Sequence, residues 1–495
     1  MSARASCGSC IAALLLATSL GRAEDAPLVL FGDPEPRAAV VWSRAPGAAT
    51  LHVRIRASTH EPWRSVDSPA HADRDASASL RLVDLTPASL YSYELWFEDS
   101  GGTRGPTTSG TFRTAPAETS VAPVRFVWSG DVGGQNICRD AEEGYPIFRP
   151  LRDEKPDFFV ALGDMVYEDD RCLPRGALGN AQVPGPRRAA VAIEDYWTMW
   201  NYNRGDAGLA AFVGQQPYVA VWDDHEVLND FGPGNDTRDN PPYTPGRHML
   251  PIGLAAFLHE NPLPPELNAT NTANDPPILY RTFRYGANLQ VFVLDTRQYR
   301  SPNSSKDLES APKTMLGRAQ LAWLEREIAR SSAMWKIVIS SVPLALMTGD
   351  LQRGTDDWAS FDLEFGCERE LRGIVEFLHD RHVRNVVWLT TDVHFATGFR
   401  YRPIENDPDW EMHEFVSGPL NAQSFPRQVL DTSFNPERLF FFGPAYIGEP
   451  KTWNEAKRWF NYGLIEIDQA GKLVVSIKDV AGATVRQVKL QPRKG

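Results

Sequence analysis

The chain has 495 residues, of which 42% are hydrophobic and 23% are charged, and its formal net charge is −12. This length is too great for one core of ordinary size, so we expect one large domain and at least one smaller one. So acidic a chain is a poor general ligand for nucleic acid or anionic membrane, although bound cations could still attract an anionic substrate locally.

The N-terminus is typical of a secretory signal peptide, which we place at residues 1–23. Arg4 gives a positive start, CIAALLLATSL is apolar but too short to span a membrane, and small residues precede Glu24. No comparable apolar stretch follows in the sequence. The sequence therefore predicts a secreted or periplasmic protein, exported by a Sec-type signal and without a membrane span.

Residues 24–117 are predicted to form a small all-β domain. Short segments with partial alternation, such as LHVRIRAS and SYELWFED, are separated by clusters of Gly, Pro, Ser and Asp. Within LVDLTPASLYSYELWF a Pro turn precedes a Tyr that opens a strand, as at the corner of a fibronectin III-like sandwich. The following TAPAETSVAP is typical of a linker.

The pattern changes in residues 118–495, where strands and helices alternate. Six continuous apolar runs each end in a polar cluster, as in strands buried on both faces: VRFVWSG, DFFVALG, YVAVWDD, LQVFVLD, WKIVISS and NVVWLTT. Predicted helices lie between them: GYPIFRPLRDEK, IEDYWTMWNYN, GRAQLAWLEREIARSS and RELRGIVEFLHDRH. This order predicts a layered α/β domain, and we expect short strands in the C-terminal tail to complete a sheet edge.

Four acidic motifs follow the ends of these strands: SGDVGGQ, LGDMVYEDD, VWDDHEVLND and LTTDVHFATG. Their candidate ligands are Asp131, Asp164, Tyr167, Asp223, Asp224, His225, Asp392 and His394. Oxygen ligands with a few imidazoles suit hard or borderline divalent and trivalent metals. A single Asp at a strand end is more often a turn residue than a ligand. Ligand-type residues at four strand ends are not expected to arise by chance. Loops that converge at strand ends are what a two-metal hydrolase needs.

The second and fourth motifs carry the most informative spacings. An Asp such as Asp164 has two oxygens and can bridge two cations. Tyr167 lies three residues further on, and a phenolate ligand near neutral pH needs a strong Lewis acid because free Tyr titrates near 10, which favours Fe(III). Asp392 and His394 are separated by one residue, so on an extended backbone both side chains face the same side.

The third motif places two Asp, a His and a Glu directly after an apolar run. Such charges are costly to bury unless cations or partners neutralise them. His225 could be a ligand or a proton donor, and Asn229 is a further possible oxygen ligand. The sequence contains no GxSxG elbow, no GxxxxGK[ST] loop and no strand–GxGxxG–helix fingerprint. It therefore lacks the motifs of an α/β-hydrolase, a P-loop protein or a dinucleotide-binding protein.

The motifs LGDMVY, WDDHEV and TTDVHFA resemble the PhoD family of alkaline phosphatases and phosphodiesterases, as do LDTRQYRS, LGRAQLAWLEREI and WKIVISSVPL. The resemblance covers nearly all of the mature chain and implies a calcineurin-like metallophosphoesterase core with Fe(III) and Ca(II). It assigns the iron to Asp131, Asp164, Tyr167 and His394. It assigns the calcium to Asp164, Asp224 and Asp392, with Asn229 as a further candidate, and contact with the phosphate to His225.

Two positions depart from the family pattern. Some members carry Cys where this chain has Asp131, and because a carboxylate is harder than a thiolate, the metal identity stays open, with other divalent metals as alternatives. Members often carry Arg where this chain has Trp197, and a less cationic, more aromatic rim could favour diesters or bulky esters over monoesters. Cys138 and Cys172 follow the first two motifs, and export would permit a disulfide between their loops. Because Cys367 is also present, the sequence leaves open which of the three cysteines pair.

We therefore expect a secreted, metal-dependent hydrolase of small-molecule phosphate esters, in which a metal-bound hydroxide attacks phosphorus and His225 protonates the leaving oxygen. The alternative enzyme is a phosphodiesterase acting on phospholipid or nucleotide diesters. The non-enzymatic alternative is a secreted ligand-binding sandwich protein with an inactive hydrolase domain. No nucleic-acid-binding surface is evident, and the sequence leaves the oligomeric state open.

Overall fold

The computed structural model describes residues 26–234, 246–269, 277–350, 354–360 and 364–493. The predicted signal peptide, residues 1–23, lies outside the described residues. Among the helices of the described part of the chain, none is both long enough and apolar enough to cross a bilayer.

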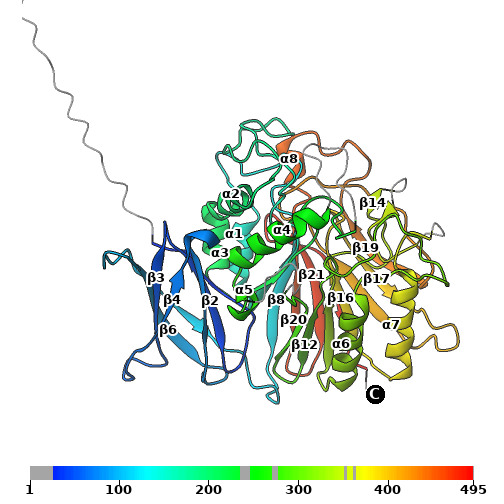
Figure 1. Ribbon diagram of the computed structural model, residues 1–495. Coiled ribbons are helices and arrows are strands. Elements are labelled where there is room, and N and C mark those ends of the chain that lie inside the picture. Colours follow the sequence, from blue (N-terminus) through cyan, green and yellow to red (C-terminus); the bar gives the residue numbers. More distant parts are fainter. Residues whose placement is uncertain (1–25, 235–245, 270–276, 351–353, 361–363, 494–495) are drawn as a thin grey trace, which may run out of the picture.

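The N-terminal strands form a two-sheet sandwich, drawn in blue in Figure 1. One sheet has the order β1(Val29–Phe31), β2(Ala39–Arg44), β5(Ser77–Leu82), and the other has the order β4(Arg64–Ala70), β3(Ala49–Arg56), β6(Leu90–Asp99), β7(Thr108–Arg113). Val41, Val53 and Leu95 belong to the buried core between the sheets. The backbone N–H of Thr86 donates to the Tyr91 hydroxyl at 2.9 Å, which forms the tyrosine corner expected from the sequence.

Two larger sheets stack face to face in the rest of the molecule. The first has the order β10(Tyr218–Val221), β9(Phe158–Leu162), β8(Val124–Ser129), β20(Asn461–Ile467), β21(Leu473–Asp479), β22(Thr484–Leu490). The second has the order β11(Arg281–Tyr285), β12(Leu289–Val293), β13(Trp335–Ile339), β16(Val386–Thr390), β18(Met412–Val416), β17(Ala396–Tyr401), β19(Pro436–Phe442). Apolar side chains from both, such as Phe126, Val160, Ile337 and Leu389, form one buried layer between them. The six buried strands predicted from the sequence are all present.

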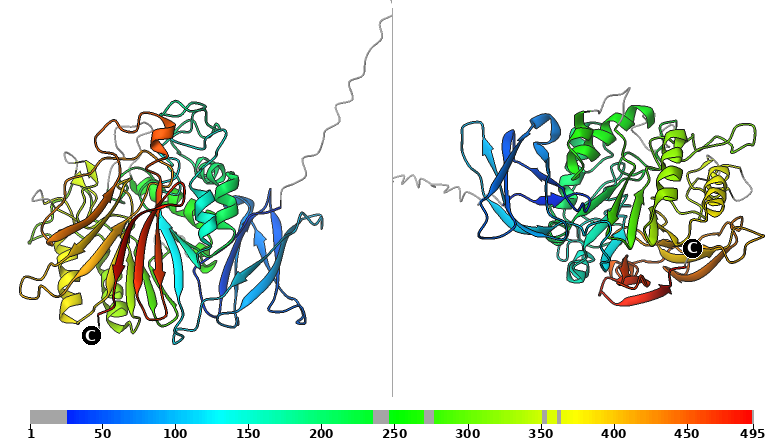
Figure 2. Two further views of the ribbon diagram at one scale, coloured as in Figure 1. Left: turned by 180° about the vertical axis from the view of Figure 1, so that it is seen from behind. Right: turned by 90° about the horizontal axis from the view of Figure 1, so that it is seen from below.

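Helices cover the outer faces of this pair of sheets, as Figure 2 shows from below. The six-stranded sheet shares a core with α1(Phe148–Glu154), α2(Ile193–Arg204), α3(Ala207–Val213) and α4(Gly246–Glu260). The seven-stranded sheet shares a core with α6(Gly317–Arg330) and α7(Glu368–Asp380). The short α5(Glu266–Ala269), α8(Trp453–Ala456), β14(Gly349–Asp350) and β15(Gly354–Thr355) lie in connections. The resulting layers are helix, sheet, sheet and helix.

Strand direction decides where the polar motifs meet. β8, β9 and β10 are mutually parallel, and so are β12, β13, β16 and β18. The tail completes the first sheet as predicted, because β20 pairs antiparallel with β8 and β22 forms the edge. Parallel strands bring their carboxyl ends to one edge of a sheet, and in open α/β sheets ligands bind beyond those ends.

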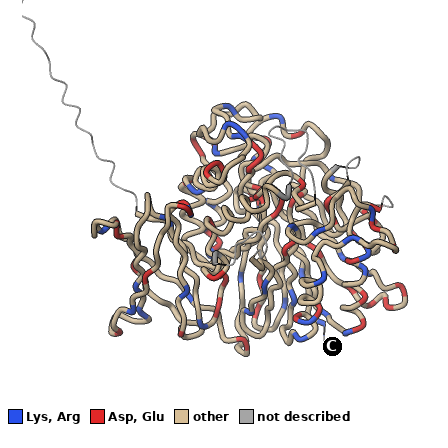
Figure 3. Tube along the Cα trace, in the orientation of Figure 1, with Lys and Arg blue, Asp and Glu red and all other residues tan. Residues whose placement is uncertain are grey.

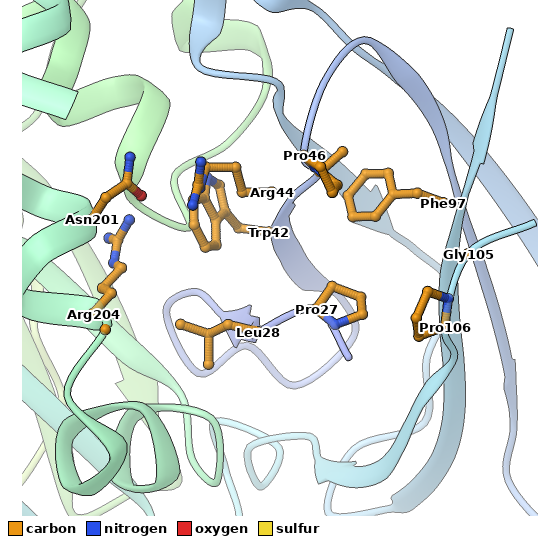
Figure 4. A pocket seen from close by; sticks show the side chains of 12 residues that line it. Pro27, Leu28, Trp42, Arg44, Pro46, Phe97, Gly105, Pro106, Asn201 and Arg204 are labelled. Carbon is orange, nitrogen blue, oxygen red and sulfur yellow. The ribbon is translucent and has the colours of Figure 1, made fainter. Parts of the chain in front are cut away.

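The sandwich packs directly against the helical side of the larger unit. Trp42 donates its indole N–H to the His259 carbonyl at 2.7 Å, and the Arg204 guanidinium lies 4.5 Å from the centre of the Trp42 ring. Asp33 forms an ion pair with Arg281. A cavity of about 390 Å³ remains in this junction, with side chains of the sandwich on one side and those of α2 on the other (Figure 4).

Candidate metal centre

The four acidic motifs meet at the carboxyl ends of β8, β9, β10 and β16. In three overlapping groups that share Asp164, the ligand atoms all lie within 4.8 Å of one another: Asp131 with Asp164 and His394; Asp164 with Asp224 and His225; and Asp164 with Asp223, Asp224 and Asp392. A fourth group joins Asp224 to Asp230 and Asp356. Asp164 is therefore the residue that links the first three groups.

Four of these residues have a left-handed backbone. Their φ angles are 65° at Asp131, 51° at Asp164, 76° at Asp392 and 57° at His394. Residues other than Gly rarely adopt this conformation, and each instance costs about 1–3 kcal/mol unless the surrounding structure holds it. The sharp turn at each strand end thus points a polar side chain back across the end of the sheet.

Glu226, the Glu of the third motif to which the sequence assigned no role, holds two of these turns together. Its Oε2 accepts from the backbone N–H of Asp223 at 2.7 Å and of Asp164 at 3.0 Å, while its Oε1 accepts from Met165 N–H at 2.9 Å. The side chain is 1% exposed. One buried carboxylate therefore ties the turn after β9 to the turn after β10.

Several carboxylate oxygens in the cluster point into the protein without a donor. Asp131 Oδ1, Asp164 Oδ2 and Asp392 Oδ2 are buried and accept no hydrogen bond from any described residue. Burial, reinforced by the neighbouring carboxylates, raises the pKa of all three acids well above its usual range. Cations would remove this penalty by neutralising the charge and filling the open ligand positions, so the donor set fits hard or borderline metal ions.

His394 is held as a neutral imidazole. Its Nδ1 donates to the Gln423 carbonyl, so Nε2 carries the lone pair and accepts from the Tyr167 hydroxyl at 3.0 Å. Nε2 also lies 3.8 Å from Asp131 Oδ1. Burial lowers the pKa of His394 to about 4. Burial, followed by the nearby carboxylates, raises the pKa of Tyr167 well above its usual range, so deprotonation of this phenol needs a cation close by.

His225 is oriented by Asp169, a residue of the second motif that sequence reasoning missed. The imidazole Nδ1 lies 2.6 Å from Asp169 Oδ1, and Asp169 Oδ2 accepts from the backbone N–H of Asn229 at 3.0 Å. Burial opposes the charged imidazolium, but Asp169 and Asp224 outweigh it and raise the pKa of His225 to about 10. The contact with Asp169 therefore favours the protonated imidazole and leaves Nε2 for another partner.

Arg297 supplies a buried positive charge at the edge of the cluster. Its Nε donates to Asp223 Oδ1 at 2.5 Å, its Nη1 donates to Asp356 Oδ2 at 2.7 Å, and its Nη2 lies 3.6 Å from Asp224 Oδ1. Asp223 Oδ1 also accepts from the Ser341 hydroxyl at 2.6 Å. Asp223 is thus partly neutralised by protein groups, unlike the acids described above. The available signal was LDTRQYR, a motif directly after a buried strand.

The two loops that carry the first ligands are cross-linked. Cys138 and Cys172 form a disulfide with a Cα–Cα distance of 5.7 Å, and Cys367 is free and buried. This pairing resolves the question that the sequence left open. Trp197, considered for a substrate rim, has its ring 5.9 Å from that of His259 on α4.

Comparison with known proteins identifies a family and a fold. The model of a family described as PhoD-like phosphatase matches residues 126–466. Alkaline phosphatase D of Bacillus subtilis (strain 168) is 26% identical over 390 residues, which cover 74% of this chain and 64% of that relative. The chain therefore spans slightly less than two thirds of the length of this curated relative.

Two solved structures share the architecture. The structure of PhoD matches with a TM-score of 0.72 and 20% identity, covering 95% of this chain and 93% of that one. A purple acid phosphatase, PPD1 from yellow lupin (Lupinus luteus) seeds, matches with a TM-score of 0.60 and 13% identity, covering 94% of this chain and 74% of that one. At these identities the likeness concerns the fold, and it confirms the layered α/β architecture expected from the sequence.

Proposed function

The chain belongs to the PhoD-like phosphatase family, and we propose that it is a metal-dependent hydrolase of phosphate esters, similar to alkaline phosphatase D. The observation that carries the proposal is the cluster around Asp164, in which buried carboxylate oxygens lie within 4.8 Å of one another. Such a concentration of negative charge in a buried place is stable only when cations or protons neutralise it.

We assign one cation to Asp131, Asp164, Tyr167 and His394, and a second to Asp164, Asp224 and Asp392, with Asn229 as a further ligand. Fe(III) suits the first set because it contains a phenol and a neutral imidazole, and Ca(II) suits the second because it offers only oxygen ligands. The bound cations would activate water and neutralise charge on the non-bridging phosphate oxygens.

We assign the proton transfer to His225. Its protonated state, favoured by the contact of Nδ1 with Asp169, suits donation from Nε2 to the departing oxygen of the ester. Arg297 and Glu226 have the positioning roles: the first neutralises Asp223, and the second fixes the backbone of Asp164. A phosphodiesterase remains the second candidate, and comparing rates on an aryl phosphate monoester and its diester separates the two.

The proposal extends to the location and layout of the protein. Export through a Sec-type signal at residues 1–23 would place the enzyme outside the cytoplasm, and the disulfide between Cys138 and Cys172 is compatible with that environment. The division into a sandwich domain, residues 24–117, and a catalytic domain, residues 118–495, is part of the proposal. Small-molecule phosphate esters are the proposed substrates.

The experiment combines elemental analysis with phosphatase rates for the wild type and three variants. Asp164→Asn should lose both metals and turnover, because Asp164 belongs to both proposed ligand sets. His225→Ala should keep the metals and lose about 10²–10⁴-fold in rate, the usual contribution of a general acid. His60→Ala, at an exposed position of the sandwich, is the control. A metal-free wild type would overturn the proposal, and loss of the metals in His225→Ala would overturn the role of His225.

A further inference from the structure

A second cavity, of about 350 Å³, lies at the opposite end of the seven-stranded sheet from the acidic centre. Trp335, Val386 and His413 line it from the amino ends of the parallel strands β13, β16 and β18. Asp392 and His394, by contrast, follow the carboxyl end of β16. In Figures 1 and 2 the C-terminus marks this end of the molecule, far from the loops around α2 and α8.

The cavity carries an excess of positive charge. Its charged lining consists of Arg400, Lys489, Arg493 and a single carboxylate, Glu411. Glu411 Oε1 lies 2.8 Å from Arg493 Nη2, and Arg400 Nε donates to Glu437 at 3.1 Å. The Lys489 ammonium has no ion-pair partner within 4.0 Å among the described residues.

This concentration of cations stands out in a chain whose net charge is −12. Figure 3 shows several Lys and Arg positions near the C-terminal end of the chain.

His413 adds a polar group with open hydrogen-bonding capacity. The residue is 8% exposed, and its imidazole makes no hydrogen bond with the described residues, its nearest acid being Glu411, with Oε1 at 4.0 Å from Nε2. Burial, together with Arg400 and Arg493, lowers the pKa of His413 to about 4. A neutral imidazole keeps one N–H donor, which can bond to an anionic oxygen.

The cavity wall is fixed in place by contacts across the chain. The backbone N–H of Arg493 donates to Asn385 Oδ1 at 2.8 Å, and Asn385 Nδ2 donates to the Arg493 carbonyl at 3.1 Å. Trp335 donates its indole N–H to the Gly471 carbonyl at 2.7 Å. The C-terminal residues that close the cavity are therefore held against the sheet.

We propose that this cavity is a binding site for a compact phosphate-class oxyanion, separate from the acidic centre. Arg and Lys are the side chains that bind phosphate oxygens by charge-assisted hydrogen bonds. The volume lies at the lower end of the range usual for small-molecule sites. Lys489 supplies the uncompensated charge and His413 supplies a neutral donor. Arg400 and Arg493, which are paired with Glu437 and Glu411, add positive charge to the wall.

The test is calorimetric titration of the metal-loaded protein with inorganic phosphate. The wild type should bind phosphate at the cavity in addition to any binding at the metal centre. Lys489→Glu should weaken the cavity event by at least about tenfold, because it removes a charge-assisted hydrogen bond and places a negative charge beside the anion. Lys489→Gln should have a smaller effect in the same direction. Arg149→Glu, an equal charge change at an exposed position of α1, should leave the binding unchanged.

Two further readouts keep the result unambiguous. Circular dichroism checks the fold of each variant, and the exposed place of Lys489 on the edge strand β22 favours retention of the fold. Inhibition of ester hydrolysis by phosphate reports the metal centre alone and should be equal in Lys489→Glu and wild type. Wild-type protein that binds no phosphate outside the metal centre, or equal affinities in Lys489→Glu and Arg149→Glu, would overturn the proposal, whether or not the protein hydrolyses esters.

Discussion

Replacing Glu226 tests whether one buried carboxylate fixes the metal ligands. In Glu226→Gln the amide oxygen can take the place of Oε2 and keep the bonds from Asp164 and Asp223, at 3.0 and 2.7 Å. The amide NH₂ then faces the Met165 N–H, which lies 2.9 Å from Oε1, so one acceptor is lost. Leaving one buried donor unpaired lowers the free energy of unfolding by about 1–3 kcal/mol. Glu226→Ala leaves three backbone N–H groups unpaired and should lower it by about 3–9 kcal/mol.

Because Asp164 has a φ of 51°, the loss should reach the metal centre as well as the stability. We expect Glu226→Gln to lower the urea midpoint and weaken metal binding, with Glu226→Ala more severe in both. The measurements are urea denaturation and elemental analysis of dialysed protein, each on metal-loaded and chelated samples.

Glu168→Gln is the matched control for Glu226→Gln. Glu168 is equally buried, at 1% exposure, but neither of its carboxylate oxygens accepts a hydrogen bond from the described residues. Removing its charge should leave stability unchanged or raise it, because burial of an unpaired carboxylate is unfavourable. Equal destabilisation by Glu168→Gln and Glu226→Gln would refute the argument that the three hydrogen bonds hold the turns.

Three further outcomes follow from other parts of the structure. Tyr167→Phe removes the hydroxyl that lies 3.0 Å from His394 Nε2, and in iron-loaded protein it should abolish the tyrosinate-to-iron absorption band; a retained band would exclude Tyr167 as a ligand. Replacing Cys138 and Cys172 by Ser opens a link across 34 residues and should lower the free energy of unfolding by about 4 kcal/mol, and an unchanged urea midpoint would contradict this. Burial lowers the pKa of His259 to about 4 from 6.5, so its neutral form stabilises the fold above pH 6.5 and this contribution is lost as the pH falls toward 4. Urea midpoints across that range should therefore fall less steeply in His259→Gln, and an equal slope would show that His259 does not titrate on unfolding.

The strand ends could be predicted because two local signals coincide there. Continuous apolar runs mark buried strands, and parallel strands bring their carboxyl ends together, so Asp131, Asp164 and Asp392 were expected to converge. The runs also show that both faces of a strand are covered. They do not distinguish a covering helix from a second sheet, and for this reason the stacking of two sheets emerges only from the structure.

The residues that contact the candidate ligands could not be predicted from the sequence. Asp223 and Asp224 are adjacent and chemically identical. Their environments differ because only Asp223 accepts a hydrogen bond from Arg297, which lies 74 residues from it along the chain. Asp169 likewise meets His225 across 56 residues. Each of these contacts depends on how loops from different strands approach one another in space, and no local pattern encodes that approach.

The left-handed backbone at four positions limits which substitutions they tolerate; these positions are Asp131, Asp164, Asp392 and His394. A β-branched side chain such as Val or Ile clashes in this conformation, whereas Asn and Gly adopt it most readily. Genetic decay of the centre should therefore pass through Asn or Gly, which remove a ligand and spare the turn. A degenerate relative of this enzyme would be recognisable by those two residues at the four equivalent sites, with the surrounding architecture preserved.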